Sequence, residues 1–184
     1  MKKESIFIYV LRLTLTLLLI SATVATLLSV VNKITEPIIA RANSEKTQKA
    51  IEAVLPGGYD EEITNYEDAT GLVTKVYKGA NGYALQVNPV GFDGPIDLMV
   101  GVDFSGKVLG ISVISHTESA GLGAIIASSN SAGEAFRNQF IGLLGPVSVD
   151  KDGGTIDAIT NATITSRAIC DGVNAALSCV AGLG

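Results

Sequence analysis

The sequence has no tryptophan, one histidine and two cysteines in 184 residues. It contains no CxxC or CxxCH motif, which excludes the common cysteine frameworks for haem c, structural zinc and iron–sulfur clusters. Cys170 and Cys179 both fall in an apolar C-terminal segment. If that segment is helical, the two residues lie about 13.5 Å apart along its axis and on opposite sides, which is too far for a disulfide. We expect both to be small core residues.

Positive charge is also scarce. The 13 lysines and arginines are outnumbered by 18 acidic residues, which gives a net charge of −5. No basic run occurs and no basic residues interleave with aromatics, so we expect no nucleic-acid partner. The sequence shows no internal repeat or low-complexity segment. Its length and its 47% hydrophobic content predict one ordinary domain plus a more apolar segment.

The apolar excess lies near the N-terminus. Residues 13–31 carry no charge, and 19 residues at helical rise come close to the thickness of a hydrocarbon core, about 30 Å. We predict a transmembrane helix over 13–31, a cytoplasmic N-terminus over 1–12, a membrane-proximal helical segment over 32–65 and a soluble domain over 66–184. Basic residues flank both ends of the span, but their excess before it favours an extracytoplasmic soluble domain; these residues are Lys2, Lys3, Arg12, Lys33 and Arg41.

A cleaved signal peptide is the alternative for this segment, since it has a basic start and small residues near Ala22 and Ala25. The apolar run continues past any such cleavage point, which favours an uncleaved anchor in the cell membrane. Within the span, Ser21, Ala25 and Ser29 form one stripe of small residues. Such a stripe permits close approach of another helix, although the serine hydroxyls could instead bond to their own helix.

The rest of the chain predicts an α+β fold, with a mainly antiparallel sheet packed with helices. An amphipathic pattern over 44–55 ends at a Pro-Gly-Gly stop signal. Two hairpins follow, with strands 72–78 and 83–88 joined by GANG, and strands 96–103 and 108–115 joined by FSGK.

Two helices are expected in the C-terminal third. Ser131 and Glu134 have the spacing of a capping box, and apolar residues up to Leu143 follow on one helical face. Alternation over 155–159 predicts a strand. A last helix from Ser166 is indicated by apolar positions at helical spacing, Ile169, Val173, Leu177 and Val180.

The stretch DAITNATITSRAI, residues 157–169, leads into that last helix and concentrates hydroxyl and amide groups. A helix N-terminus presents unpaired N–H groups and a partial positive charge, which suits a phosphate. One N-cap residue needs a single hydroxyl, so an anion site and an ordinary cap are both open from the chemistry alone. The groups available for a cradle are Thr160, Asn161, Thr163, Thr165 and Ser166.

The same stretch resembles the flavinylation motif D-x-x-[ST]-G-A-T-x-[ST] of the FMN-binding domain. This domain occurs in the G subunit of Rnf electron-transport complexes and in the C subunit of the sodium-pumping NADH:quinone oxidoreductase. Asp157, Thr160 and Ala162 match the pattern, and the resemblance implies that Thr163 carries FMN through a phosphoester. Asn161 stands where the family has glycine; asparagine is the non-glycine residue that best tolerates a positive φ.

A second stretch, HTESAGLGA at 116–124, resembles the H-x-E-[TS]-x-G-L-G loop of that family. The resemblance implies that this loop lies near the isoalloxazine ring, with Leu122 covering an apolar ring face and Gly121 and Gly123 allowing close backbone approach. Glu118 and Ser119 would belong to the same cofactor-binding set. A solvated turn is the alternative for Glu118. For His116 we expect a hydrogen-bonded structural role, with a role as catalyst or ligand as the alternative.

Two further segments, 82–103 and VNKITEPIIA after the anchor, resemble the family in the same order. The single span and the short length favour the Rnf G subunit over its longer relative. The resemblance implies an electron-transferring flavoprotein subunit of an ion-translocating ferredoxin:NAD⁺ oxidoreductase, not a stand-alone enzyme. Its expected partners are the membrane, other Rnf subunits including a second covalent-flavin subunit, and a flavin transferase during maturation. No catalytic residue and no resident metal are predicted, although Asp157 could orient the acceptor loop or bind a metal while the transferase acts.

Three alternatives remain at this point. One is the corresponding C subunit of a quinone reductase. Another is a membrane-tethered, non-redox module that binds an anion at the same helix terminus. The last is a stand-alone flavin shuttle.

Overall fold

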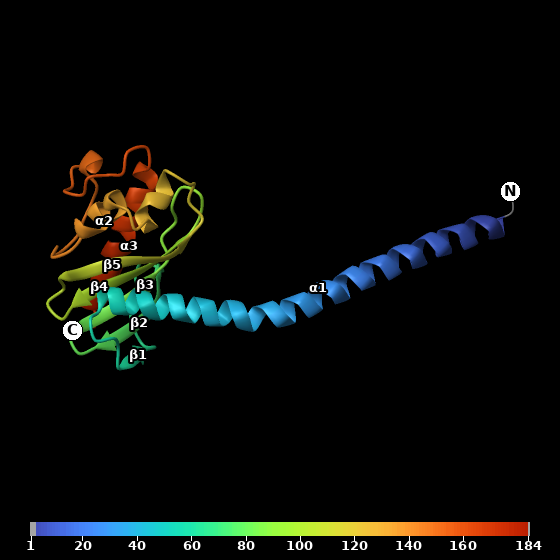
Figure 1. Cartoon of the computed structure of the whole chain (residues 1–184), viewed down its shortest axis with the longest axis horizontal. Helices are drawn as coiled ribbons and strands as arrows, with labels where there is room; N and C mark the ends of the chain where they lie inside the picture. Colours follow the sequence, from blue (N-terminus) through green and yellow to red (C-terminus); the bar gives the residue numbers. More distant parts are fainter. Residues whose placement is uncertain (1–2, 184) are drawn as a thin grey trace. The chain divides into compact units, whose positions relative to one another are not determined.

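The structure is a computed structural model that describes residues 3–183. The chain divides into two units, with the boundary between Glu45 and Lys46. Helix α1 (Lys3–Val54) runs across this boundary, as Figure 1 shows. The amphipathic helix that the pattern over 44–55 indicates is confirmed as far as Val54, but it forms the last turns of α1 and is not a separate short helix. No glycine interrupts α1 and it contains one proline, Pro37.

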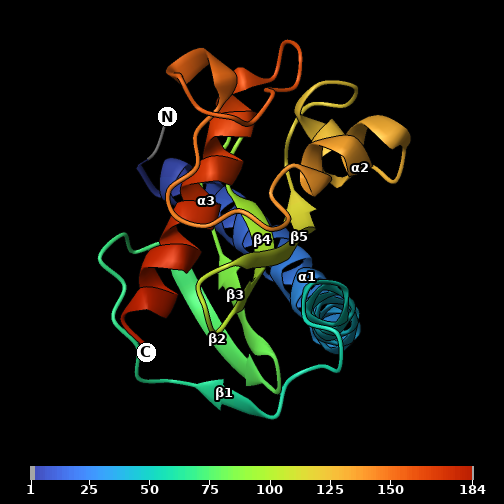
Figure 2. The ribbon, with the colours of Figure 1, turned by 90° about the vertical axis from the view of Figure 1, so that its left-hand side faces the viewer.

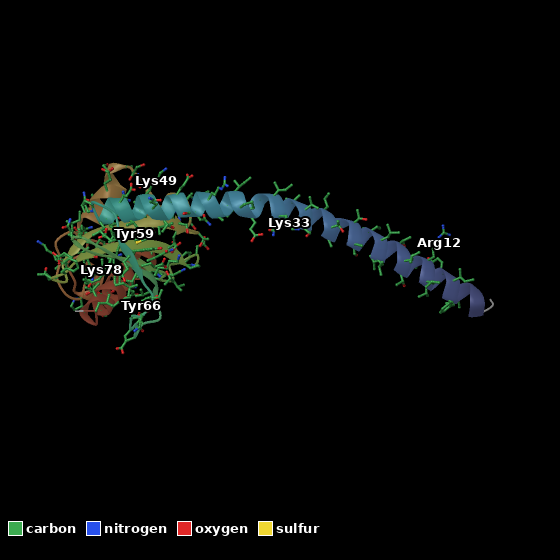
Figure 3. All side chains as sticks on the ribbon, turned by 90° about the horizontal axis from the view of Figure 1, so that it is seen from below. Arg12, Lys33, Lys49, Tyr59, Tyr66 and Lys78 are labelled. Atoms are coloured by element: carbon green, nitrogen blue, oxygen red, sulfur yellow. The ribbon has the colours of Figure 1, made fainter. Side chains whose placement is uncertain are left out.

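The N-terminal unit consists of the apolar part of α1. This is the one helix in the described residues that is long and apolar enough to cross a membrane. Its threonine hydroxyls donate to carbonyls of their own helix; Thr23, for example, donates to Leu19 at 2.8 Å. Figure 3 labels Arg12 and Lys33, which stand on either side of the apolar run. These features support a membrane anchor, whose exact boundaries stay a prediction.

The second unit is built on one five-stranded antiparallel sheet with the strand order β1-β2-β3-β4-β5. Its strands are β1 (Glu61–Ile63), β2 (Val73–Gly79), β3 (Gly82–Val87), β4 (Ile96–Asp103) and β5 (Val108–His116). Both predicted hairpins are confirmed, as is the α+β fold class. The sequence pattern did not indicate the short edge strand β1.

Alternating side chains give the sheet two buried faces. One face packs against α3 (Thr163–Ala181) and includes Leu85 and Val100. Their neighbours Ala84 and Met99 lie on the opposite face, against the C-terminal turns of α1. In Figure 2, α3 and the end of α1 are seen on either side of the central strands. The sheet thus holds α3, whose first residue is Thr163, as a firmly packed element.

The helix α2 (Ser131–Asn138) begins one residue away from the predicted cap. Its N-cap is Asn130, whose side chain accepts a hydrogen bond from Gly133 N at 2.9 Å. The predicted capping box of Ser131 and Glu134 was therefore wrong, since Ser131 is already inside the helix. The helix ends at Asn138, so that Phe140 is buried from a turn that follows it.

Residues 155–159 do not form the predicted strand. Ile156 makes a single parallel bridge to Val149, and its side chain is buried. Apolar and polar residues do alternate in this segment, but the bridge at Ile156 is its only strand-like pairing among the described residues. The segment is instead a loop that leads from the short 3₁₀ turn η2 (Asp150–Asp152) towards α3.

Cys170 and Cys179 are free and buried on α3, as expected for small core residues. Burial raises the pKa of the Cys170 thiol to about 12. A thiol with so high a pKa stays protonated near neutral pH and is a poor nucleophile. Both cysteines therefore contribute packing to this fold.

Candidate functional site

A pocket of about 390 Å³ opens at the N-terminal end of α3. Three parts of the chain line it: the loop after β5, the η2 turn and the first turn of α3. Phe92, from the loop between β3 and β4, completes the lining. The lining residues are Phe92, Glu118, Ser119, Leu122, Gly123, Lys151, Asn161, Ala162, Thr163, Ile164 and Thr165.

The backbone before α3 turns sharply at Asn161. This residue has φ 62° and is the one non-glycine residue with positive φ in the described part of the chain. Asn161 thus adopts the positive φ that asparagine was expected to tolerate at this position. Ala162 is the N-cap and offers no side-chain hydrogen bond. Thr163 is therefore the first helical residue, and its hydroxyl is not used as a cap.

Ser166 stabilises the turn at Asn161 through two hydrogen bonds. Its buried hydroxyl accepts a hydrogen bond from Ile159 N at 3.0 Å and donates one to Ala162 O at 3.0 Å. Both partners belong to the loop that carries Asn161. Ser166 does not line the pocket, so its role in the structure is to hold the loop against α3.

Glu118 joins the two motif stretches, 116–124 and 157–169, across the pocket. Glu118 is only 7% exposed. One carboxylate oxygen accepts a hydrogen bond from the Thr165 hydroxyl at 2.7 Å, and the other accepts one from Asp93 N at 3.2 Å. These bonds tie the loop after β5 both to α3 and to the loop that carries Phe92. The solvated-turn alternative for Glu118 is therefore wrong.

Two glycines leave room for this carboxylate. A Cβ added at Gly91 would collide with Glu118 Oε1, and one added at Gly123 would collide with Glu118 Oε2. The Cβ at Gly123 would also come within 2.9 Å of Thr165 Oγ1. Close packing around Glu118 thus explains why side chains are missing at these two positions.

Lys151 brings a positive charge to the pocket. Its ammonium donates a hydrogen bond to Thr163 Oγ1 at 2.8 Å. The next residue, Asp152, forms a bidentate ion pair with Arg167 of α3, with N–O distances of 2.6 and 2.7 Å. Hydrogen bonding from Arg167 lowers the pKa of the Asp152 carboxyl. The η2 turn is therefore attached to the same helix that carries Thr163.

The mouth of the pocket is apolar. Phe92 is 68% exposed, and Leu122 and Ile164 are each about half exposed. Large apolar side chains at the edge of a pocket provide a surface on which a flat, apolar ligand group can pack. The pocket thus has a polar end at Thr163 and Lys151 and apolar side chains around it.

Most of the site residues expected from sequence come together here. Eight of them line the pocket: Glu118, Ser119, Leu122, Gly123, Asn161, Ala162, Thr163 and Thr165. Gly121, Asp157, Thr160 and Ser166 do not line it. Sequence reasoning missed Phe92, Lys151 and Ile164, and the signal for Lys151 was a lysine in a Lys-Asp-Gly-Gly turn shortly before the motif.

Asp157 and Thr160 line a second cavity of about 490 Å³ beside α2. The backbone of Asp157 is fixed by Gln139, whose side chain accepts from Asp157 N at 2.7 Å and donates to Asp157 O at 3.2 Å. No group of three or more potential metal-binding side chains occurs in residues 3–183. An orienting role of Asp157 in the acceptor loop stays a prediction.

His116 ends β5, and it does not line the pocket. Its Nδ1 is buried and finds no hydrogen-bond partner among the described residues. The hydrogen-bonded structural role expected for this histidine is therefore not supported at that atom.

Comparison with known proteins shows which family and which proteins this chain is similar to. The FMN-binding domain family matches residues 91–178, a range that includes both stretches around the pocket. The chain is 34% identical over 181 residues to the G subunit of the ion-translocating oxidoreductase complex of Methanosarcina acetivorans, covering 92% of this chain and 93% of that protein. It is 29% identical to the G subunit of the Na(+)-translocating ferredoxin:NAD(+) oxidoreductase complex of Acetobacterium woodii, with 90% and 88% covered.

A solved structure shares the fold. The crystal structure of the C subunit of Na(+)-translocating NADH-quinone reductase from Parabacteroides distasonis aligns with a TM-score of 0.53 and 20% identity. The alignment covers 77% of this chain and 90% of that one. At this identity, the similarity concerns the fold alone.

Proposed function

The chain belongs to the family formed by the G subunits of ion-translocating oxidoreductase complexes, and from this premise we propose that it is the FMN-carrying, electron-relaying subunit of a membrane Rnf-type complex. The resemblance to this family noted in the sequence is confirmed, as is the preference for the G subunit over the quinone-reductase relative. FMN exchanges electrons through its isoalloxazine ring, whereas a protein contributes binding, orientation and solvent exclusion.

The observation that carries the proposal is the meeting of two distant stretches in one pocket. The Thr165 hydroxyl and the Glu118 carboxylate lie 2.7 Å apart although 47 residues separate them in the chain. This contact places the loop expected at the flavin ring beside the threonine expected to carry the phosphate. A pocket of about 390 Å³ is within the usual range for small-molecule sites, about 300–1,000 Å³.

The residues of the pocket suit the two ends of FMN. Thr163 has a hydroxyl that no cap uses, at a helix N-terminus whose free N–H groups favour an anion. We therefore assign the phosphoester to Thr163 Oγ1. Phe92, Leu122 and Ile164 supply the apolar surface for the ring and limit its contact with water. Glu118 holds these segments together through Thr165 and Asp93.

The membrane anchor and the partners follow from the same proposal. The apolar part of α1 would keep the domain beside the other membrane subunits, including a second covalent-flavin subunit. The basic residues before the span favour a domain on the extracytoplasmic side. There, a covalent bond prevents loss of the cofactor by diffusion. A flavin transferase is the partner that this attachment requires.

Fluorescence in a denaturing gel tests the proposal. Full-length protein co-expressed with a flavin transferase is expected to run as a yellow-fluorescent band, because a covalent flavin survives denaturation. The Thr163→Ala variant should give a band of equal protein staining with no fluorescence. A non-fluorescent wild-type band would favour a non-redox anion-binding module, and a fluorescent Thr163→Ala band would move the attachment site.

A further inference from the structure

Lys151 is held beside Thr163 by contacts on both of its neighbours in the chain. Asp150 accepts a hydrogen bond from Ala158 N at 3.1 Å, and its own N–H donates to Ile156 O at 2.7 Å. Asp152 is bound to Arg167 of α3. An exposed lysine is ordinarily free to sample many rotamers. Here its backbone is fixed on both sides, and its ammonium reaches Thr163 Oγ1 at 2.8 Å.

The charges around the pocket leave Lys151 as the cation available to a phosphate. It is the only lysine or arginine among the described residues that line the pocket. The Arg167 guanidinium is committed to Asp152. The remaining charged lining residue is Glu118, and the η2 turn adds the carboxylates of Asp150 and Asp152. Without Lys151, the one charged side chain in the described lining of the pocket would be the Glu118 carboxylate.

We propose that Lys151 is a positioning residue for flavin attachment, which orients the Thr163 hydroxyl before the reaction and pairs with the phosphodiester after it. This inference rests on the proposed function. A hydrogen bond from an ammonium to Oγ1 occupies one oxygen lone pair, so the hydroxyl proton and the second lone pair point elsewhere. The same charge stabilises the negative charge that develops on Oγ1 as its proton leaves.

The attachment is a phosphoryl transfer without oxidation or reduction. The Thr163 oxygen forms a bond to phosphorus, and the phosphoanhydride bond of a flavin dinucleotide breaks. A nucleoside monophosphate leaves, and the threonine proton passes to a base of the transferase or to water. A dinucleotide is the donor class required, because a simple phosphate monoester lacks a comparable leaving group.

Time-resolved intact mass spectrometry tests the inference on the full-length protein in detergent, with a flavin transferase and flavin adenine dinucleotide. We expect Lys151→Gln to slow the mass gain by about tenfold or more, as expected for the loss of one charge-assisted hydrogen bond. Lys151→Arg should recover much of the rate, since it keeps the charge. The matched control is Lys78→Gln, which removes an exposed lysine from β2 that does not line the pocket (Figure 3).

Two further readouts separate positioning from folding. Unloaded Lys151→Gln is expected to melt at the wild-type temperature, because this side chain is exposed. In loaded protein, the rise in melting temperature on flavin attachment should be smaller for Lys151→Gln than for wild type. If the unloaded Lys151→Gln variant melts below the wild-type temperature, the Lys151→Arg variant is the deciding test. A Lys151→Arg variant that melts at the wild-type temperature but does not recover the rate of flavin attachment overturns the inference.

The outcomes distinguish a failure of the proposed function from a failure of the role assigned to Lys151. A wild-type protein that gains no flavin mass contradicts the proposed function itself. A wild-type protein that gains it, with Lys151→Gln loading at the same rate, overturns the inference and leaves the proposed function intact. Slow loading of Lys151→Gln with recovery in Lys151→Arg supports both.

Discussion

Asn161 adopts a left-handed backbone conformation directly before the helix that presents Thr163. In most L-residues this conformation brings Cβ too close to the following carbonyl oxygen. Asparagine tolerates it better than other side chains, and glycine tolerates it without that steric cost. The residue therefore keeps the turn that the family's glycine would make, and adds an amide to the lining of the pocket.

Substitution at this position should separate backbone shape from the amide. Asn161→Gly is expected to change the free energy of unfolding by less than about 1 kcal/mol. Asn161→Ala should lower it by about 1–2 kcal/mol, the cost of a left-handed conformation with a Cβ, and should slow flavin attachment. Thermal unfolding and gel fluorescence measure the two effects. Equal stability of the alanine and glycine variants would contradict this view of the turn.

Gly123 is a second residue where the pocket depends on a missing side chain. Gly123→Ala should separate Glu118 from Thr165, because the added Cβ would collide with both side chains. We expect a loss of about 1–3 kcal/mol in the free energy of unfolding, typical of overpacking. Chemical denaturation measures this loss.

Gly110→Ala is the matched control for that substitution. A Cβ at Gly110 would meet its nearest neighbours at 3.8–4.0 Å, an ordinary contact distance. Its effect should stay below about 1 kcal/mol. Equal losses at the two glycines would show that packing around Glu118 does not explain the requirement at Gly123.

At the scale of single residues, the sequence identified the groups at the start of α3 because they occur close together in the chain. It could not identify Phe92, which reaches the pocket from a loop about 70 residues before Thr163. Lys151 was visible only as part of a turn, because its hydrogen bond to Thr163 depends on how η2 is attached to α3. Contacts made through tertiary structure leave no local pattern.

At the scale of elements, strands were predicted correctly where the alternating segment has a neighbouring strand to pair with. The hairpins at Gly79–Gly82 and across FSGK followed from turn chemistry and alternation, and their strands pair as expected. Residues 155–159 alternate in the same way, but they pair only through Ile156. Strand β1 has three residues and a charged start, so it gave too short a signal. A strand needs a neighbour, which the local sequence does not specify.

The start of α2 gives an element-scale prediction. Asn130→Ala should lower the free energy of unfolding by about 0.5–2 kcal/mol, because the Gly133 N–H loses its cap. Ser131→Ala should have little effect, since Ser131 lies inside the helix and alanine is a good helix former. Urea unfolding of both variants compares them directly. A larger loss for Ser131→Ala would restore the capping box that the sequence suggested.

At the scale of the whole molecule, α1 serves two different environments. Its N-terminal part exposes apolar side chains along its length, as a membrane helix does. Its last turns belong to the second unit, where Ile51, Val54 and Leu55 are almost fully buried against the sheet. The sequence predicted both parts but not their continuity. It could not do so because the two hydrophobic patterns differ and a proline lies between them.

Truncation should separate these two roles. A chain beginning at Asn43 is expected to be soluble without detergent and to keep the melting temperature of the domain, since it retains the buried turns of α1. A chain beginning at Pro56 would expose the sheet face around Met99. Burying each large aliphatic side chain contributes about 1.5–3 kcal/mol, so this shorter chain should unfold or aggregate. Circular dichroism melting compares the two, and equal stability would contradict the packing of α1 on the sheet.

The most direct measurement of the central claim is tandem mass spectrometry on protein isolated from its native membranes. Trypsin cleaves after Lys151 and Arg167, which releases residues 152–167 as one peptide. The account predicts that this peptide carries FMN and that its fragments place the group on Thr163. An unmodified peptide, or FMN on another of its hydroxyls, would contradict the account.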